Sequence, residues 1–205
     1  MVVNYSKDSE YHSQRNNRLI PHSSCNATSM IMALKQAGVR LPFPGRYQPE
    51  DYLTLFLQSD QAKDKMKDLA PWALDPKSEK QLYPPQEVHI VMEWAVNTLL
   101  NKEIVKFSTE TPLQQIINHI DNRKGVVLSG RFPLNNTTID HMVSLAGYMK
   151  HQNSISYLLI DDPYGDYKTS YRSHRGNNIP IAFNEAKQVL KPVKNNQKKW
   201  AYLVG

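Results

Sequence analysis

The sequence predicts an α+β fold, because two kinds of pattern follow one another along the chain. In the first 124 residues apolar side chains recur mainly three and four positions apart, as Met30, Ile31 and Leu34 do, which is helical spacing. After Gly125, short apolar runs alternate with turn-forming residues, which is typical of strands. Helices followed by antiparallel strands indicate an α+β class, and 205 residues suit one domain.

The first half of the chain is predicted to be mainly helical. Residues 1–22 are rich in turn formers and are expected to be irregular. Helices are predicted from Cys25 to about Ala37, from Pro49, over 61–69 on the surface, over 87–100, and after Thr111 as cap and Pro112 as first residue. The proline-rich stretch 70–85 predicts an extended loop, and residues 104–107 predict a short strand.

The second half is predicted to form the sheet. Strands are expected over 125–130, 142–148, 156–160, 179–183 and 201–204, with a short helix over 185–190. The basic stretch from Lys191 to Lys199 is interrupted by Pro192 and two asparagines and is expected to be a solvated loop.

The net charge and the hydropathy pattern indicate which classes of binding partner suit the chain. The chain carries 25 Lys and Arg against 19 Asp and Glu, a net charge of +6, which favours an anionic partner. The excess is diffuse, and no basic stripe with interleaved aromatics indicates nucleic acid. No apolar run approaches the roughly 20 residues of a membrane span. Residues 1–17 lack the apolar core of a signal peptide, so we expect cytoplasmic synthesis and any export by another route.

The single cysteine, Cys25, is the candidate nucleophile. It follows Ser23 and Ser24, either of which can cap the helix that begins there. Free N–H groups and the helix dipole at this end stabilise a thiolate, which is the reactive form. The alternative is a small buried structural residue, since free cysteine is often buried. One cysteine also excludes a disulfide within the chain.

A cysteine nucleophile needs a base, and the chain offers seven histidines. Four lie in polar stretches expected to be surface loops, and His119 is predicted on a helix face; the four are His12, His22, His151 and His174. His89 precedes Glu93 by four residues, which predicts an exposed helix contact rather than a metal site. His141 differs, because it is predicted to begin a strand after a polar turn.

A carboxylate to orient His141 is available if two strands pair. The strand that ends at Asp161 and Asp162 would then bring its end beside the start of the His141 strand. Successive strand residues face opposite sides, so only one of the two aspartates can reach the histidine. The alternative is that both merely cap a turn. Together with Asp166 they lack the spacing of a calcium loop, and we expect no metal.

Four segments in this order resemble the C39-like cysteine peptidases. They are residues 13–17, 24–32, 141–148 and 162–165, and residues 199–202 are similar to the last strand of that family. The resemblance implies a papain-like fold with Cys25 as nucleophile, His141 as base and later acid, and Gln14 as oxyanion donor. It also implies that Asp162, before Pro163, is the orienting aspartate, and that no cofactor is needed.

The chain departs from the family pattern in two places, which bear on specificity. Asn26 stands where many members have glycine, and residues 39–103 form a long, mainly helical insertion within a single domain of residues 1–205. Asn26, Trp72 and Asp140 are taken as candidate substrate contacts, although Trp72 could instead anchor its loop. The resemblance implies a cysteine peptidase or amidase.

The expected substrate is a peptidoglycan peptide, as for phage lysins released to the cell wall without a signal peptide, or a leader peptide. The alternative function is a catalytically silent C39-like module that binds or inhibits a protein partner.

Overall fold

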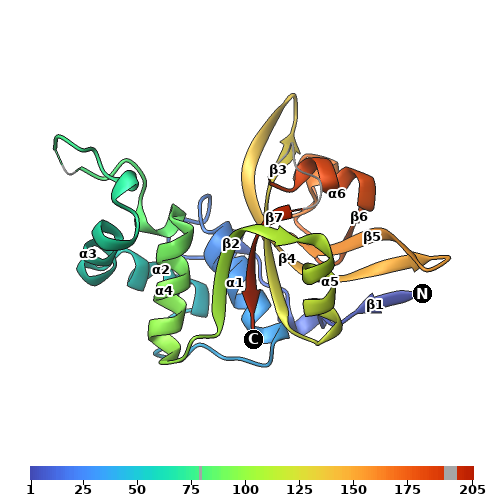
Figure 1. Cartoon of the computed structure of the whole chain (residues 1–205), viewed down its shortest axis with the longest axis horizontal. Coiled ribbons are helices and arrows are strands. Elements are labelled where there is room, and N and C mark those ends of the chain that lie inside the picture. Colours follow the sequence, from blue (N-terminus) through green and yellow to red (C-terminus); the bar gives the residue numbers. More distant parts are fainter. Residues whose placement is uncertain (79, 192–197) are drawn as a thin grey trace.

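The computed structural model describes residues 1–78, 80–191 and 198–205 and confirms the α+β class. Helices α1 to α4 gather on one side of an antiparallel sheet (Figure 1). The α-helices among the described residues are α1 (Cys25–Gln36), α2 (Pro49–Leu57), α3 (Asp60–Leu69), α4 (His89–Leu100), α5 (Leu113–Asp121) and α6 (Phe183–Val189). Short 3-10 helices are η1 (Asp8–Glu10), η2 (Gln14–Asn16), η3 (Pro71–Ala73), η4 (Pro85–Glu87) and η5 (Tyr167–Thr169).

The sheet has the strand order β2-β7-β3-β4-β5-β6, with β1 paired to β4. Its strands are β1 (Val2–Asn4), β2 (Val105–Pro112), β3 (Gly125–Leu134), β4 (Thr137–His151), β5 (Ser154–Asp161), β6 (Ile179–Ala182) and β7 (Lys198–Val204). The predicted pairing of the His141 and Asp161 strands is confirmed, because β4 and β5 form an antiparallel pair with Ser144 opposite Asp161.

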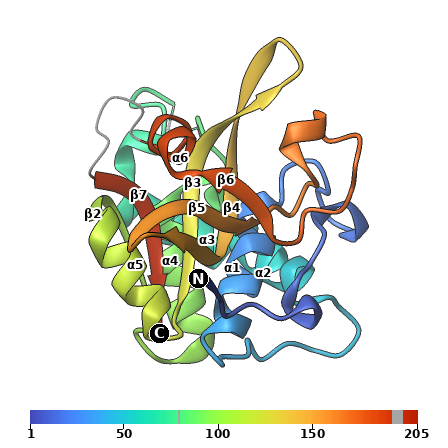
Figure 2. The same cartoon turned by 90° about the vertical axis from the view of Figure 1, so that its right-hand side faces the viewer.

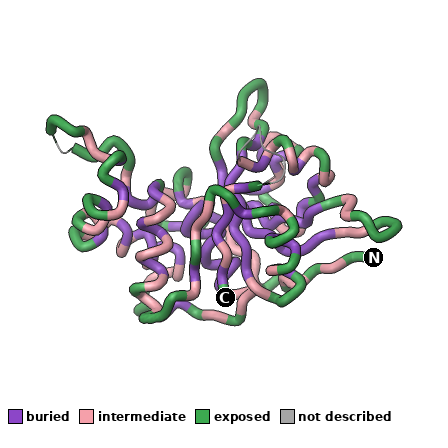
Figure 3. The backbone as a smooth tube through the Cα atoms, in the orientation of Figure 1, coloured by how far each residue is buried: buried purple, intermediate pink, exposed green. Residues whose placement is uncertain are grey.

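Apolar side chains pack on both faces of the sheet. Val127 belongs to a buried cluster with α1, α2 and α4, whereas its neighbours Val126 and Leu128 belong to a second cluster with α5 and α6. This alternation follows from the two-residue period of a strand. Figure 3 shows buried residues concentrated where α1 meets the sheet, and exposed residues at the projecting loops.

Helix α1 lies directly against the middle of the sheet. A side chain at Gly125 would bring its Cβ within 2.0 Å of the Ala33 carbonyl oxygen, so glycine permits this close approach. The hydroxyl of Ser29 donates to the carbonyl oxygen of Met142 at 3.0 Å. These contacts tie α1 to β3 and β4, and they set the first turn of α1 beside the strand that carries His141.

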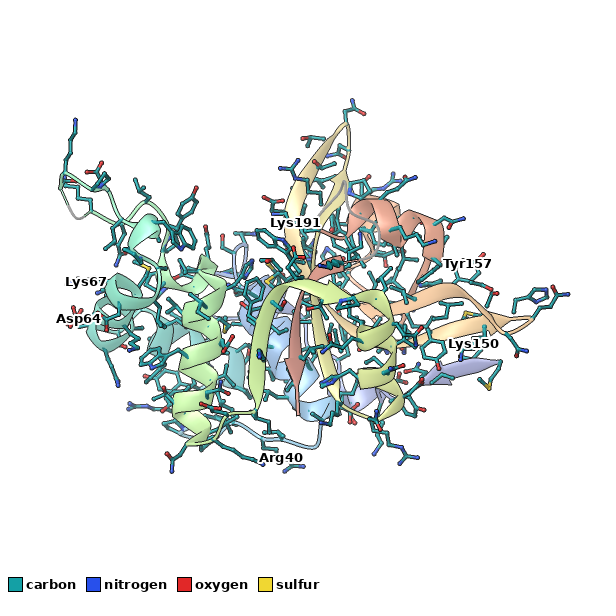
Figure 4. The ribbon with its side chains drawn as sticks, viewed as in Figure 1. Arg40, Asp64, Lys67, Lys150, Tyr157 and Lys191 are labelled. Carbon is teal, nitrogen blue, oxygen red and sulfur yellow. The ribbon has the colours of Figure 1, made fainter. Side chains whose placement is uncertain are left out.

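The segment between α1 and β2 folds as the helices α2, α3 and α4. The helix predicted over 87–100 is confirmed as α4, and one face of it is fully buried through Val91, Met92 and Ala95, next to the buried cap residue Val88. Helix α3 is a surface helix, as predicted, and its charged side chains pair along it, as in Lys67 to Asp64 at 2.8 Å (Figure 4). The stretch from η3 to η4 projects from this helical side (Figure 1).

Several predicted boundaries are wrong. Residues 1–22 are not all irregular, because Val2–Asn4 pair with β4. Thr111 does not cap α5; it lies in β2, and Pro112 occupies the cap position. His141 does not begin its strand, since β3 and β4 continue as a two-stranded arm to Leu134 and Thr137. This arm projects beyond the body of the molecule (Figure 2), and its polar residues are the reason that the sequence predicts a turn there.

The prediction of a solvated loop from Lys191 to Lys199 is also wrong at its end, and residues 192–197 lie outside the described residues. Lys199 is fully buried in β7. Its ammonium group donates to the carbonyl oxygens of Lys187 at 2.7 Å and Leu190 at 3.0 Å. A charged side chain is tolerated inside the protein here because the end of α6 supplies acceptors.

Candidate active site

Cys25 is the first residue of α1 and carries a half-buried free thiol. Ser24 occupies the cap position, as predicted, but its side chain does not cap the helix. Its hydroxyl instead accepts a hydrogen bond from the Asn17 amide at 2.9 Å. The Ser24 side chain therefore leaves the N–H of Cys25, at the start of α1, available to stabilise a thiolate or an oxyanion.

His141 and Asp162 form a buried pair. Nε2 of His141 lies 2.7 Å from Oδ1 of Asp162, and the two side chains are 4 % and 0 % exposed. The Tyr164 N–H also donates to Oδ1, at 2.9 Å. Because Nε2 faces the carboxylate, Nδ1 is left on the opposite side of the ring.

Cys25 interacts with the His141 side chain of this pair. Burial lowers the pKa of His141, but the carboxylate of Asp162, together with a hydrogen bond from Cys25 and its charge, outweighs burial and raises that pKa to about 10. A histidine that keeps its proton between a carboxylate and a thiol favours a thiolate–imidazolium pair. The structure therefore brings Cys25, His141 and Asp162 together.

Asp161 faces the other side of the chain, as the strand period predicts. Its carboxylate accepts hydrogen bonds from the hydroxyl of Ser6 and the N–H of Asn178, both at 2.8 Å. Burial raises the pKa of Asp161, and these two hydrogen bonds partly offset the rise. Asp161 thus holds the N-terminal segment and the stretch before β6, whereas Asp162 holds the histidine.

Gln14 lies in η2 with its side chain 2 % exposed. Its backbone N–H donates to the carbonyl oxygen of Pro163, and its side-chain amide donates to that of Pro21, both at 2.9 Å. The first contact ties Gln14 to the residue after Asp162, and the second ties it to the loop before Cys25. The amide carries two N–H groups, so one remains for a further acceptor.

The three candidate substrate contacts fall in different environments. Asn26 is 6 % exposed, donates to the Gln86 carbonyl oxygen, and accepts from the Ala27 N–H at 2.7 Å. Because its amide oxygen and amide nitrogen both have partners inside the protein, Asn26 joins the Cys25 helix to η4. A contact of Asn26 with substrate stays a prediction.

Asp140 and Trp72 are exposed. Asp140 accepts from Lys191 at 2.9 Å and from Arg131 at 3.4 Å, and Lys191 lies near the base of the arm (Figure 4). Trp72 is 63 % exposed and its ring meets that of Tyr83, with ring centroids 6.0 Å apart. The role of Trp72 as a substrate contact stays a prediction.

Sequence reasoning missed the pair formed by His89 and Tyr202. Nδ1 of His89 lies 3.0 Å from the Tyr202 hydroxyl, which donates to the His89 carbonyl oxygen at 3.1 Å. The expected contact of His89 with Glu93 is wrong, because Glu93 accepts from the Phe107 N–H. Burial is the main cause that lowers the pKa of His89, to about 4, and the charge of Lys191 lowers it further.

Tyr202 extends the site toward β7. Burial raises its pKa, and the charges of Glu93 and Cys25 raise it further. The sequence carries no local signal for this pairing, since 113 positions separate His89 from Tyr202.

Over the described ranges, no group of three or more His, Cys, Asp or Glu side chains is arranged to hold a metal ion. In the same part of the chain, no helix combines the length and apolar character needed to cross a membrane.

Comparison with models of protein families identifies a match for this chain. The model of the Peptidase_C39 like family matches residues 6–190, which include every residue of the site except Tyr202. No curated protein matches the chain.

Proposed function

The chain belongs to the Peptidase_C39 like family, and we propose that it is an active cysteine peptidase whose triad is Cys25, His141 and Asp162. The observation that carries the proposal is the buried 2.7 Å contact between His141 Nε2 and Asp162 Oδ1, with Cys25 next to the same imidazole. Family membership supports a cysteine-peptidase type of activity, and this geometry supports the assignment of the three roles.

In the first step, the Cys25 thiolate attacks the carbonyl carbon of the scissile amide. A bond forms from Sγ to carbon, and the carbonyl π electrons move to oxygen. The imidazolium of His141 then gives its proton to the amide nitrogen as the C–N bond breaks, so that a neutral amine leaves and an acyl-enzyme remains.

In the second step, the neutral imidazole takes a proton from water, and the hydroxide attacks the thioester carbon. The C–S bond breaks, the carboxylic acid product leaves, and the thiolate and imidazolium are restored. Asp162 stays ionised throughout and holds the ring through Nε2. The water consumed and the two products balance the hydrolysis.

The oxyanion formed in both steps needs donors. We assign this role to the N–H of Cys25, which has no intrahelical partner as the first residue of α1, and to the second N–H of the Gln14 amide. Gln14 is held by Pro21 and Pro163, on either side of the site, so its amide is ordered before substrate binds.

For the substrate we propose a peptide of the bacterial cell wall. The net charge of +6 favours an anionic polymer, and Arg172, His174 and Arg175 are exposed on the loop that follows Asp162. Trp72 and Tyr83 offer an aromatic surface on the helical side. A leader or other protein segment is the second substrate class.

The test compares the wild-type protein with Cys25→Ala on soluble cell-wall peptides and on a peptide library, with cleavage read by mass spectrometry. We expect new termini with the wild type and none with Cys25→Ala. Cleavage that persists in Cys25→Ala overturns the triad. A wild type that cleaves nothing but still binds a protein partner would show the silent binding module instead.

A further inference from the structure

Tyr171 lies next to the triad in a backbone conformation that bulky residues seldom adopt. Ser170 and Tyr171 have φ angles of 52° and 60°, in the left-handed region. The conformation is held from two sides, by Tyr171 N–H to the Asp166 carbonyl oxygen at 3.0 Å and by Arg15 to the Tyr171 carbonyl oxygen at 3.3 Å. This unusual backbone points the Tyr171 side chain inward, where it is 4 % exposed.

The Tyr171 ring packs against the catalytic histidine. Its centroid is 6.0 Å from that of His141, with the planes at 81°, an edge-to-face contact. Tyr164 packs on the same ring at 5.1 Å. Both tyrosines are held by one side chain, because Arg15 also donates to the Tyr164 carbonyl oxygen at 2.6 Å.

Two buried oxygens of the residues around His141 have hydrogen-bonding capacity that is unused. Oδ1 of Asp162 already accepts from His141 and Tyr164. Oδ2 of Asp162 and the Tyr171 hydroxyl are buried, and neither has a partner of ordinary hydrogen-bond geometry among the described residues. Both belong to one buried cluster, because the Tyr171 ring packs on His141 and His141 contacts Asp162. After burial itself, the Asp162 carboxylate is the main influence that raises the pKa of Tyr171, followed by Cys25.

We propose that Tyr171 is a positioning residue of the triad, whose hydroxyl donates to Oδ2 of Asp162 while its ring supports His141. The inference rests on the proposed function of that site. With a donor on each oxygen, the carboxylate cannot rotate, and Oδ1 stays aimed at Nε2 of His141. Buried polar oxygens are rarely without a hydrogen-bond partner, and this contact would give a partner to both the Tyr171 hydroxyl and Oδ2 of Asp162.

The test is Tyr171→Phe, which removes one oxygen and keeps the ring. Tyr167→Phe is the matched control, since the Tyr167 hydroxyl donates to Glu185 at 3.0 Å.

We measure kcat, KM and the pH dependence of Cys25 alkylation. We expect Tyr171→Phe to lower kcat by roughly 10- to 100-fold, the loss of one hydrogen bond to a charged group, with KM unchanged. The acid limb of alkylation should move to higher pH, because a loosened carboxylate stabilises the imidazolium less. Tyr167→Phe should change neither.

A double-mutant cycle with Asp162→Asn separates positioning from general support. If Tyr171 acts through Asp162, its substitution has no further effect on the alkylation profile once Asp162 is replaced. An unchanged profile in Tyr171→Phe, or a shift that is equal in both backgrounds, overturns the proposal. Alkylation needs no substrate, so the result stands even if the wild type cleaves no peptide.

If Tyr171→Phe does not fold, fluorotyrosine at position 171 gives a second measurement. Its ¹⁹F resonance should follow the titration of the triad and lose that response in Asp162→Asn. A resonance indifferent to the triad overturns the proposal.

Discussion

Asp161 and Asp162 are neighbours in the chain, yet their carboxylates point in opposite directions and contact different residues. Asp162 contacts His141 at 2.7 Å, whereas Asp161 accepts from Ser6 and Asn178 at 2.8 Å. Both side chains are almost fully buried. Two aspartates with equal burial and different partners provide a natural pair of variants.

Asp162→Asn is expected to lower kcat by about 10²- to 10⁴-fold, the usual contribution of general acid–base catalysis, because an amide cannot hold the imidazolium. Asp161→Asn should leave kcat nearly unchanged and lower the unfolding midpoint. Steady-state kinetics and thermal unfolding of both variants check this. Equal losses of kcat in the two variants would contradict the assignment of Asp162.

Gly176 has no side chain, and the backbone of Asp162 occupies the space that a Cβ at this position would need. A Cβ at Gly176 would lie 1.8 Å from the Asp162 carbonyl oxygen, and the Gly176 carbonyl oxygen accepts from the Asp162 N–H at 2.8 Å. Gly176→Ala should therefore displace Asp162 and reduce both kcat and Cys25 alkylation at mildly acidic pH. The control is Gly45→Ala, where a Cβ meets nothing within 4 Å. A fully active Gly176→Ala enzyme would contradict this prediction.

Asn26 joins the Cys25 helix to η4 through the Gln86 carbonyl oxygen. Asn26→Ala leaves that buried oxygen without its donor and should lower the free energy of unfolding by about 1–3 kcal/mol. Asn122→Ala is the control, because its amide makes an exposed bond to the Asn118 carbonyl oxygen. It should change stability by no more than about 0.5 kcal/mol. Equal denaturant midpoints for the two variants would show that Asn26 is not a structural link.

His89 is expected to make the fold sensitive to acid. Its pKa is lowered from 6.5 to about 4 in the folded protein, so between these values the unfolded chain binds the proton more readily. Its contribution to stability is therefore complete above pH 6.5 and declines as pH falls toward 4. The free energy of unfolding of His89→Gln should vary less over this window than that of His151→Gln, an exposed control. Identical pH dependence in both would refute the assignment.

Much of the site could be predicted from the sequence because its signals are local. The predicted helix start places Cys25 at a helix N-terminus, and the two-residue period of a strand predicts that the side chains of Asp161 and Asp162 face opposite sides. The choice between them came from the resemblance, in which the aspartate precedes proline. The position of His141 within a longer strand could not be predicted, since the residues of the exposed arm are polar and pair only with one another.

The rest depends on contacts between distant segments. The insertion of β7 between β2 and β3 brings Tyr202 to His89, and no local pattern indicates this. Lys199 lies in a stretch that reads as a solvated loop, yet the end of α6 gives its ammonium group acceptors. The link between Asn26 and Gln86 is equally hidden in the sequence, because the two residues lie 60 positions apart.

The most direct test of the triad is the rate of Cys25 alkylation as a function of pH in the native protein. Cys25 is the only cysteine, so mass spectrometry reads the site without ambiguity. The pKa of His141 is raised to about 10, and a protonated imidazole next to a thiol stabilises negative charge on the sulfur, so the proposed triad predicts a reactive Cys25 at mildly acidic pH. Fast modification there is predicted for the wild type and for His174→Ala, an exposed control, and it should be lost in His141→Ala. Slow modification that only unfolding accelerates, or a profile unchanged in His141→Ala, would contradict the account.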